Sequence, residues 1–297
     1  MEMNKEKILK AGKIASELKE YAKTIIKPGI PLLEIAEKIE TKMNKLGGKP
    51  AFPTNLSINE IAAHYTPGYN DETLAHGLLK VDLGVHIDGW ISDTAFSIDL
   101  ENSDDNKKLI EASKAGLEKA QEIIKKGKTT SEIGEAIDLE IQKKGFIPII
   151  NLSGHQIEKY DLHAGLTIPN IDDKKNIPIE SGLYAIEPFA TLSSGSGKIY
   201  DGRPSGIYIL QEEKNIRNPR ARQILKHIIE KYKTLPFCSR WIVKKFGTSS
   251  LIYLKQLETN GNIYQFNQLI ETTGKKISQT ENTIFLTKEG EKIITTK

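Results

Sequence analysis

The feature that most constrains the fold is a pair of apolar segments, residues 79–87 and 90–100, joined by Asp88-Gly89. Asp-Gly between two alternating runs is a strong signal for a two-residue β-hairpin turn. With that turn, the numbers of any two paired residues add up to 177. The sequence therefore predicts an antiparallel hairpin of known register.

This register places two aspartates on one face of the hairpin. Asp82 faces Ala95 and Asp93 faces Gly84, and opposed residues share a face because side chains alternate along each strand. The two aspartates are diagonal neighbours, roughly 7–8 Å apart at the backbone, and Gly84 is expected to leave open space beside them. The other face carries apolar side chains: Val81, Leu83, Val85 and Ile87.

Two carboxylates this close repel each other, so one must take up a proton unless a cation lies between them. A pair of divalent ions about 3.5–4 Å apart would fit that space. The alternative is that both aspartates lie on a solvated sheet face and have no common function.

Three further side chains favour the metal interpretation. His155 follows Ser153-Gly154 in a predicted loop, Glu187 interrupts an apolar strand just before Pro188, and Glu281 precedes the apolar strand 284–286. A carboxylate inside such a strand is costly unless it is paired or bound to metal. One histidine with four carboxylates suits a hard, oxygen-rich dinuclear site.

The rest of the chain alternates helical and strand patterns. Amphipathic helical spacing at residues 4–26 and 32–46 recurs at 104–126 and 131–144, which indicates two similar halves. Later segments are predicted as follows: a Ser/Gly-rich loop at 193–206, a helical stretch at 219–260 and final strands at 283–287 and 291–296.

Composition argues against several classes of protein. The 297 residues carry a formal net charge of +3, which gives no strong case for a specific nucleic-acid partner. Residues 1–10 lack the apolar region of a signal peptide, and no stretch is long enough for a membrane-spanning helix. The single cysteine, Cys238, cannot form an internal disulfide, which fits a reducing compartment. We expect a cytoplasmic protein in which this thiol is half-buried.

Scattered lysine pairs, such as Lys125-Lys126 and Lys143-Lys144, are expected to be solvated surface. The alternative is that these lysine pairs form a weakly basic surface that contacts the ribosome transiently.

Several segments together resemble the type 2 methionine aminopeptidases, and the resemblance covers nearly the whole chain. The matching segments are Lys49-Pro50-Ala51-Phe52-Pro53, Ala62-Ala63-His64-Tyr65-Thr66-Pro67, Val81-Asp82-Leu83-Gly84-Val85-His86, Ser92-Asp93-Thr94-Ala95, Asn151-Leu152-Ser153-Gly154-His155, Leu162-His163-Ala164-Gly165 and Ile186-Glu187-Pro188-Phe189. The family implies an α+β pita-bread (creatinase/aminopeptidase-like) fold, in which helices cover a pseudo-twofold β-sheet. It also implies a metal-dependent hydrolase that removes the initiator methionine from nascent polypeptides and prefers small second residues.

The resemblance assigns roles to individual residues. It implies two divalent ions (Co²⁺, Mn²⁺ or Fe²⁺, with Zn²⁺ as an alternative) and the metal ligands Asp82, Asp93, His155, Glu187 and Glu281. Metal-bound hydroxide is expected to attack the scissile carbonyl, His163 or His64 to stabilise the oxyanion, and Glu187 to carry the proton. Phe52 and Leu162, with both of these histidines, are expected to line the substrate site.

The long interval between Glu187 and Glu281 matches the type 2 members, which carry an inserted helical subdomain. We expect a catalytic domain at 1–206 and 276–297 and an insertion at 207–275. The chain resembles the compact archaeal form, and a monomer is expected. It departs from the family at Asn282, where the resemblance calls for histidine, so hydrogen bonding around the last ligand is expected to differ.

Two other functions remain open at this point. Prolidases and proline-specific aminopeptidases resemble the same fold and ligand set, but they usually carry a domain before the catalytic one. A binding protein on this fold would be expected to have lost ligands, whereas this chain retains them.

Overall fold

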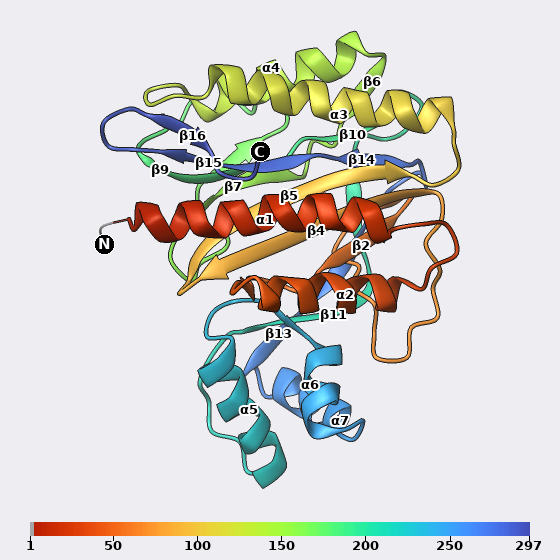
Figure 1. Cartoon of the computed structure of the whole chain (residues 1–297), viewed down its shortest axis with the longest axis vertical. Helices are drawn as coiled ribbons and strands as arrows, with labels where there is room; N and C mark the ends of the chain where they lie inside the picture. Colours follow the sequence, from red (N-terminus) through yellow and green to blue (C-terminus); the bar gives the residue numbers. More distant parts are fainter. Residues whose placement is uncertain (1–2) are drawn as a thin grey trace.

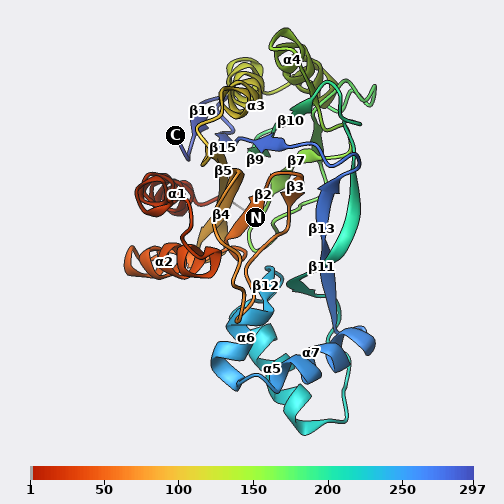
Figure 2. The same cartoon turned by 90° about the vertical axis from the view of Figure 1, so that its right-hand side faces the viewer.

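A computed structural model of the chain describes residues 3–297, so Met1 and Glu2 of the charged N-terminal run lie outside the described residues. Helices cover one side of a central sheet, and three further helices gather at one end of the molecule (Figures 1 and 2). The helices are α1 (Lys5–Ile25), α2 (Leu32–Lys45), α3 (Asp104–Ile123), α4 (Thr130–Lys143), α5 (Pro219–Lys231), α6 (Ser239–Phe246) and α7 (Ser250–Thr259). Within residues 3–297, no helix combines the length and the apolar character that crossing a membrane requires.

The main sheet joins strands from the beginning, middle and end of the chain. Its path runs β1 (Lys49–Pro50), β4 (Leu78–Ile87), β5 (Trp90–Asp99), β15 (Glu281–Leu286), β9 (Gly182–Ile186), β7 (Ser153–Ile157) and β8 (Thr167–Pro169). β2 (Asn55–Ile58) pairs with β4, and β16 (Lys292–Ile294) pairs with β15. The late strand β15 therefore lies between the predicted hairpin and the pair β9–β7.

The predicted hairpin and its register are confirmed. β4 and β5 are antiparallel, Asp82 faces Ala95, and Gly84 faces Asp93. Asp88 and Gly89 both have positive φ angles, 49° and 89°, as a two-residue hairpin turn with matching strand twist requires. The aspartates therefore share one face of the sheet.

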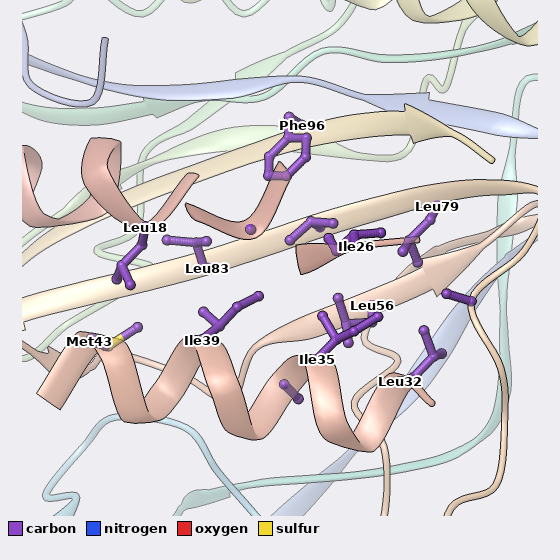
Figure 3. Packing of buried hydrophobic residues seen from close by; sticks show 14 of the residues in the cluster. Leu18, Ile26, Leu32, Ile35, Ile39, Met43, Leu56, Leu79, Leu83 and Phe96 are labelled. Atoms are coloured by element: carbon purple, nitrogen blue, oxygen red, sulfur yellow. The ribbon is translucent and has the colours of Figure 1, made fainter. Parts of the chain in front are cut away.

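The opposite face of the hairpin is covered by the first two helices (Figure 3). Leu18 of α1 and Ile35, Ile39 and Met43 of α2 are fully buried in one cluster with Leu83 of β4. Their spacing of three or four residues puts them on one side of each helix. This packing stabilises the back of the strands that carry the aspartates.

The second helix pair, α3 and α4, covers the other half of the sheet, at the top of Figures 1 and 2. Ile133 and Ile137 of α4 are fully buried in one cluster with Ile186 of β9 and Ile284 of β15. A side chain and backbone capping box at Thr129 and Glu132 starts α4. The predicted pair of helices at each half is thus present.

Two short sheets complete the fold. One contains β6 (Phe146–Pro148), β10 (Phe189–Leu192) and β14 (Ile277–Gln279). The other contains β3 (Ile61–Ala63), β11 (Ile199–Leu210), β12 (Phe237–Cys238) and β13 (Ile263–Glu271). The long strands β11 and β13 stand to one side of the main sheet and lead down to α5–α7 (Figure 2).

The predicted loop at 193–206 is wrong from residue 199 onward, because β11 begins there. The segment 207–275 is also not helical throughout, since it contains the end of β11 and all of β13. The helices α5–α7 have their own apolar cluster, which includes Ile224, Ile228 and Leu254. The division into a catalytic domain and an insertion stays a prediction. Strand β11 crosses its first border, at residue 207, and β13 ends just before its second, at residue 275.

Candidate metal centre

The side chains named as metal ligands from the sequence lie together in the structure. Atoms of Asp93, His155 and Glu281 lie within 4.8 Å of one another, and so do atoms of Asp82, Glu187 and Glu281. Glu281 belongs to both groups. The five side chains therefore form one cluster with two overlapping sets of donors, the arrangement that two neighbouring cations require.

Strand pairing explains why these distant residues meet. Ala95 of β5 faces Asp82 on one side and Glu281 of β15 on the other. Opposed residues share a face, so Glu281 projects on the same side of the sheet as the two aspartates. His155 lies in β7, which is hydrogen-bonded to β9, and Glu187 directly follows β9. His155 thus belongs to a strand, whereas a loop was predicted.

The cluster leaves buried polar atoms without protein partners. Among residues 3–297, the buried atoms that accept or donate no hydrogen bond include Oδ1 of Asp82 and of Asp93, both carboxylate oxygens of Glu281 and Nδ1 of His155. A buried ionised carboxylate without a partner is strongly unfavourable. Oxygen donors with one imidazole fit Mn²⁺, Fe²⁺, Co²⁺ or Zn²⁺, so the donor set fits divalent metal.

Burial and mutual repulsion dominate the electrostatics of the cluster. Burial raises the pKa of Asp82 to about 7. Burial and then the charge of Asp82 raise the pKa values of Asp93 and Glu187 well above the usual range. Glu281 is affected in the same way by burial and by Asp93. Burial lowers the pKa of His155 to about 3, which keeps its ring neutral and able to bind a cation.

A cavity of about 320 Å³ opens onto the cluster. Its lining includes all four residues named for the substrate site: Phe52, His64, Leu162 and His163. This volume lies at the lower end of the range of about 300–1,000 Å³ for small-molecule sites.

The space expected beside Gly84 is filled by Phe52, which corrects the sequence prediction. A Cβ at Gly84 would lie 2.3 Å from Cε1 of Phe52 and 3.0 Å from Cβ of Ala51. The missing side chain therefore lets the Phe52 ring pack directly on β4. Any larger residue at position 84 would push this ring from its place in the cavity wall.

His64 adopts a strained backbone conformation, with φ at 62°. Its Nδ1 lies 3.1 Å from the carbonyl oxygen of Asn267, and a carbonyl only accepts, so Nδ1 carries the hydrogen. Burial lowers the pKa of His64 to about 4. The ring is thus neutral and its Nε2 is an acceptor. The His163 ring lies edge-on to His155, with 4.5 Å between centroids.

Sequence reasoning missed Gln279. Its Nε2 donates to Oε1 of Glu187 at 3.1 Å and to Oδ2 of Asp82 at 3.4 Å, so this amide orients two proposed ligands. It precedes Glu281 by two residues, but nothing in the local pattern marks it. Only the period-two alternation toward Glu281 points to this position.

Asn282, the departure from the family pattern, lies one residue beyond Glu281. Its Oδ1 accepts from Nζ of Lys19 at 3.1 Å and from Oγ1 of Thr296 at 2.9 Å. Neighbouring strand residues point to opposite faces, so this amide hydrogen-bonds behind the cluster and does not reach into it. Burial lowers the pKa of Lys19 to about 8.

Comparisons with known proteins agree with this geometry. The profile of metallopeptidase family M24 matches residues 6–222. The methionine aminopeptidase of Pyrococcus horikoshii is 45% identical over 298 residues, covering 99% of this chain and 100% of that protein. Two solved structures share the fold. A thermophilic Arx1 has a TM-score of 0.83 at 16% identity, covering 99% of this chain and 91% of the other. The methionine aminopeptidase of Thermotoga maritima has a TM-score of 0.70 at 21% identity, covering 99% and 98%.

Membership rests on two independent matches, one to a family profile that spans more than half of the chain and one to a full-length relative. The solved structures add agreement of the fold. The chain belongs to metallopeptidase family M24 and, within it, to the methionine aminopeptidases.

Proposed function

We propose that this protein removes the N-terminal methionine from newly made polypeptides by metal-dependent hydrolysis. The observation that carries the proposal is a cluster of carboxylates, several of whose buried oxygens lack a protein partner, beside a partly apolar cavity. Family membership agrees, since the relative that matches over the full length is a methionine aminopeptidase.

We assign two divalent ions to the five donors Asp82, Asp93, His155, Glu187 and Glu281. Bound there, the ions would supply Lewis-acid polarisation and lower the pKa of water. Co²⁺, Mn²⁺, Fe²⁺ and Zn²⁺ all suit the donors, and affinity order alone does not select among them. Metal analysis of protein purified without added metal identifies the ion and its number.

We assign substrate binding, charge stabilisation and proton transfer to residues of the chain. Phe52 and Leu162 provide apolar surface for the methionine side chain, whose burial contributes about 1.5–3 kcal/mol. Nδ1 of His64 donates to the carbonyl oxygen of Asn267, so Nε2 is left to accept a hydrogen bond from the substrate. This leaves His163 as the histidine that stabilises negative charge on the substrate oxygen. Gln279 holds Oε1 of Glu187, and we assign proton transfer to Oε2 of that carboxylate.

The helices α5–α7 and their flanking strands, within 207–275, are proposed to shape the substrate entrance as an inserted part. Ile207, Pro236, Phe266 and Leu269 from this segment line the cavity. None of the five proposed ligands comes from it. Residues after the methionine must pass this wall, which favours small second residues.

The test compares release of free methionine from Met-Ala-Ser and Met-Lys-Ser, with and without added metal, and uses Ala-Pro as the prolidase substrate. We expect metal-dependent release from Met-Ala-Ser, much slower release from Met-Lys-Ser and no hydrolysis of Ala-Pro. Faster hydrolysis of Ala-Pro would identify a prolidase. No hydrolysis of any peptide by the metal-loaded protein would favour a binding protein on this fold.

We further propose that the protein works in the cytoplasm as a monomer and contacts the ribosome transiently. Cys238 is a free thiol that is fully buried, more so than predicted, and burial raises its pKa to about 12. An inert thiol suits a reducing compartment. Co-sedimentation with ribosomes at low and high salt tests the contact, and light scattering tests the monomer.

A further inference from the structure

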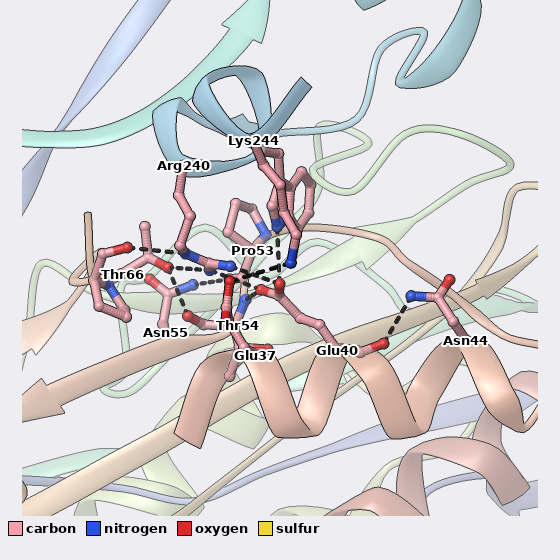
Figure 4. A network of polar contacts seen from close by, with 11 residues as sticks. Glu37, Glu40, Asn44, Pro53, Thr54, Asn55, Thr66, Arg240 and Lys244 are labelled. Atoms are coloured by element: carbon pink, nitrogen blue, oxygen red, sulfur yellow. Dashed lines mark hydrogen bonds and ion pairs between the residues drawn. The ribbon is translucent and has the colours of Figure 1, made fainter. Parts of the chain in front are cut away.

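A second buried acidic group lies between α2 and α6, away from the metal cluster (Figure 4). Glu40 of α2 is 8% exposed and Arg240 of α6 is 3% exposed. Nη1 and Nη2 of Arg240 donate to Oε2 and Oε1 of Glu40 at 2.7 and 2.9 Å. Nε1 of Trp241 donates to the same carboxylate at 2.8 Å. The pair is therefore bidentate and reinforced by a third donor.

The same two side chains also hold two loops. The backbone N–H of Thr54 donates to Glu40 at 3.3 Å. Nε of Arg240 donates to the carbonyl oxygen of Pro67 at 3.0 Å. A hydroxyl bridge joins the loops directly, because Oγ1 of Thr66 donates to the carbonyl oxygen of Thr54 at 2.9 Å. One buried ion pair thus fixes the backbone before β2, at Thr54, and after β3, at Pro67.

These loops carry cavity residues. Phe52 lies two positions before Thr54, His64 lies two positions before Thr66, and both line the cavity. Phe52 has little freedom, because its ring packs against Gly84. His64 has a positive φ, which residues other than glycine adopt rarely, so the surrounding bonds help to maintain it.

We propose that Glu40 and Arg240 are positioning residues that fix the wall of the methionine pocket, through the loops that carry Phe52 and His64. This inference rests on the proposed function, because it assigns that pocket to methionine. A buried ion pair adds little net stability over an apolar pair of similar volume. Its directional bonds to Thr54 and Pro67 are what apolar side chains cannot replace. The position of α6 and the shape of the pocket are therefore coupled.

A neighbouring ion pair provides a matched control. Lys244 of α6 lies 3.3 Å from Glu37 of α2, and both side chains are largely exposed. This pair joins the same two helices, and its hydrogen bond from Lys244 to Glu37 involves neither the Thr54 loop nor the Pro67 loop. If joining the helices were sufficient, loss of either pair would have similar consequences.

The experiment compares Arg240→Met and Glu40→Gln with Lys244→Met. It measures kcat and KM on Met-Ala-Ser, metal content, and amide hydrogen exchange of peptides covering residues 52–67. For Arg240→Met we expect kcat/KM to fall about tenfold, chiefly through KM, as expected for a displaced binding wall. Exchange in 52–67 should accelerate while metal content stays at the wild-type level. Glu40→Gln should give a smaller change in the same direction, and Lys244→Met should match wild type.

Equal behaviour of Arg240→Met and Lys244→Met would overturn the proposal. So would loss of metal, because the pair would then act on the ligand cluster instead of the pocket. Failure of both Arg240→Met and Glu40→Gln to fold would show that the pair supports the fold itself, which also contradicts the proposal. Hydrogen exchange does not depend on catalysis. A wild-type protein inactive on methionine peptides would therefore refute the proposed function, while the exchange data would still decide the positioning.

Discussion

The metal cluster and the Glu40–Arg240 pair are both buried acidic sites, but they treat their carboxylates in opposite ways. Glu40 accepts hydrogen bonds from Arg240, Trp241 and the backbone of Thr54. Glu281 is 1% exposed, and both of its oxygens lack a donor among the described residues. The Glu40–Arg240 pair finds its partners within the protein, whereas the metal cluster leaves buried oxygens without a protein partner. A buried carboxylate therefore indicates a binding site when its protein partners are missing.

The largest effect is expected from Asp93→Asn, which removes a charge where two cations are proposed to lie. Turnover of Met-Ala-Ser should fall by several orders of magnitude while circular dichroism stays that of the wild type. Asp88→Asn in the same hairpin is the control, because Asp88 is exposed and forms a surface ion pair with Lys7. Near-normal turnover of Asp93→Asn would show that this residue is not a ligand.

In the metal-free protein, removing a carboxylate should change the free energy of unfolding in different directions at the two sites. Glu40→Ala leaves Arg240 buried without its partner, so it should reduce the free energy of unfolding by about 3–5 kcal/mol. Asp82→Asn removes one of several mutually repelling carboxylates and should leave this free energy unchanged or raise it. Urea unfolding in the presence of a chelator measures both. A loss of similar size in the two variants would remove the distinction drawn between the sites.

Metal should stabilise the protein through the proposed ligand cluster and not through the Glu40–Arg240 pair. At a free Mn²⁺ concentration of 100 times its Kd, the wild type should gain about 2.7 kcal/mol in the free energy of unfolding. Glu281→Gln should lose most of this gain, since Glu281 belongs to both donor groups. Arg240→Met should keep it. Thermal unfolding with and without Mn²⁺ checks the three proteins, and equal gains in all three would argue against the ligand assignment.

The smallest effect concerns Glu271, a third buried acid with full partners. Burial alone would raise its pKa, but donors from Lys275, Ser196 and Thr273 bring it down to about 2. A depressed pKa stabilises the fold above the unfolded value, roughly 4.3, and this contribution is lost as pH falls toward 2. At pH 7, Glu271→Gln should cost no more than about 3 kcal/mol, because the neutral amide keeps part of this hydrogen bonding.

The measurement for Glu271 is urea unfolding of wild type and Glu271→Gln at pH 7 and pH 3. The difference between the two proteins should shrink at the lower pH, because the wild-type carboxylate begins to bind a proton as it unfolds. An equal difference at both pH values would mean that the charge of Glu271 contributes nothing.

Local patterns predicted some parts of this molecule well. The Asp88-Gly89 turn fixed the register, and with it the shared face of Asp82 and Asp93. His155, Glu187 and Glu281 stand out by their place beside apolar strands, and the family resemblance, now confirmed, implies the same residues as ligands. Roles of these residues stay predictions, although the structure brings all five together.

Other parts could not be predicted because they depend on contacts between distant segments. The sequence predicts a loop where β11 begins, because glycines and serines hide a strand whose partner β13 is far along the chain. The same holds for Arg240, which meets Glu40 two hundred positions away. Gly84 was expected to open a space, but packing from Phe52 fills it. Tertiary packing decided each of these cases.

The place of β15 in the sheet has a consequence for how the protein matures. This strand is synthesised after its neighbours β5 and β9, yet it lies between them and brings Glu281 to the cluster. Contacts between residues so far apart form slowly, because a long loop must close first. Nascent chains that still lack β15 hold the other donors without the one that joins both groups. We therefore expect the proposed donor set to be complete only after β15 has paired with β5 and β9.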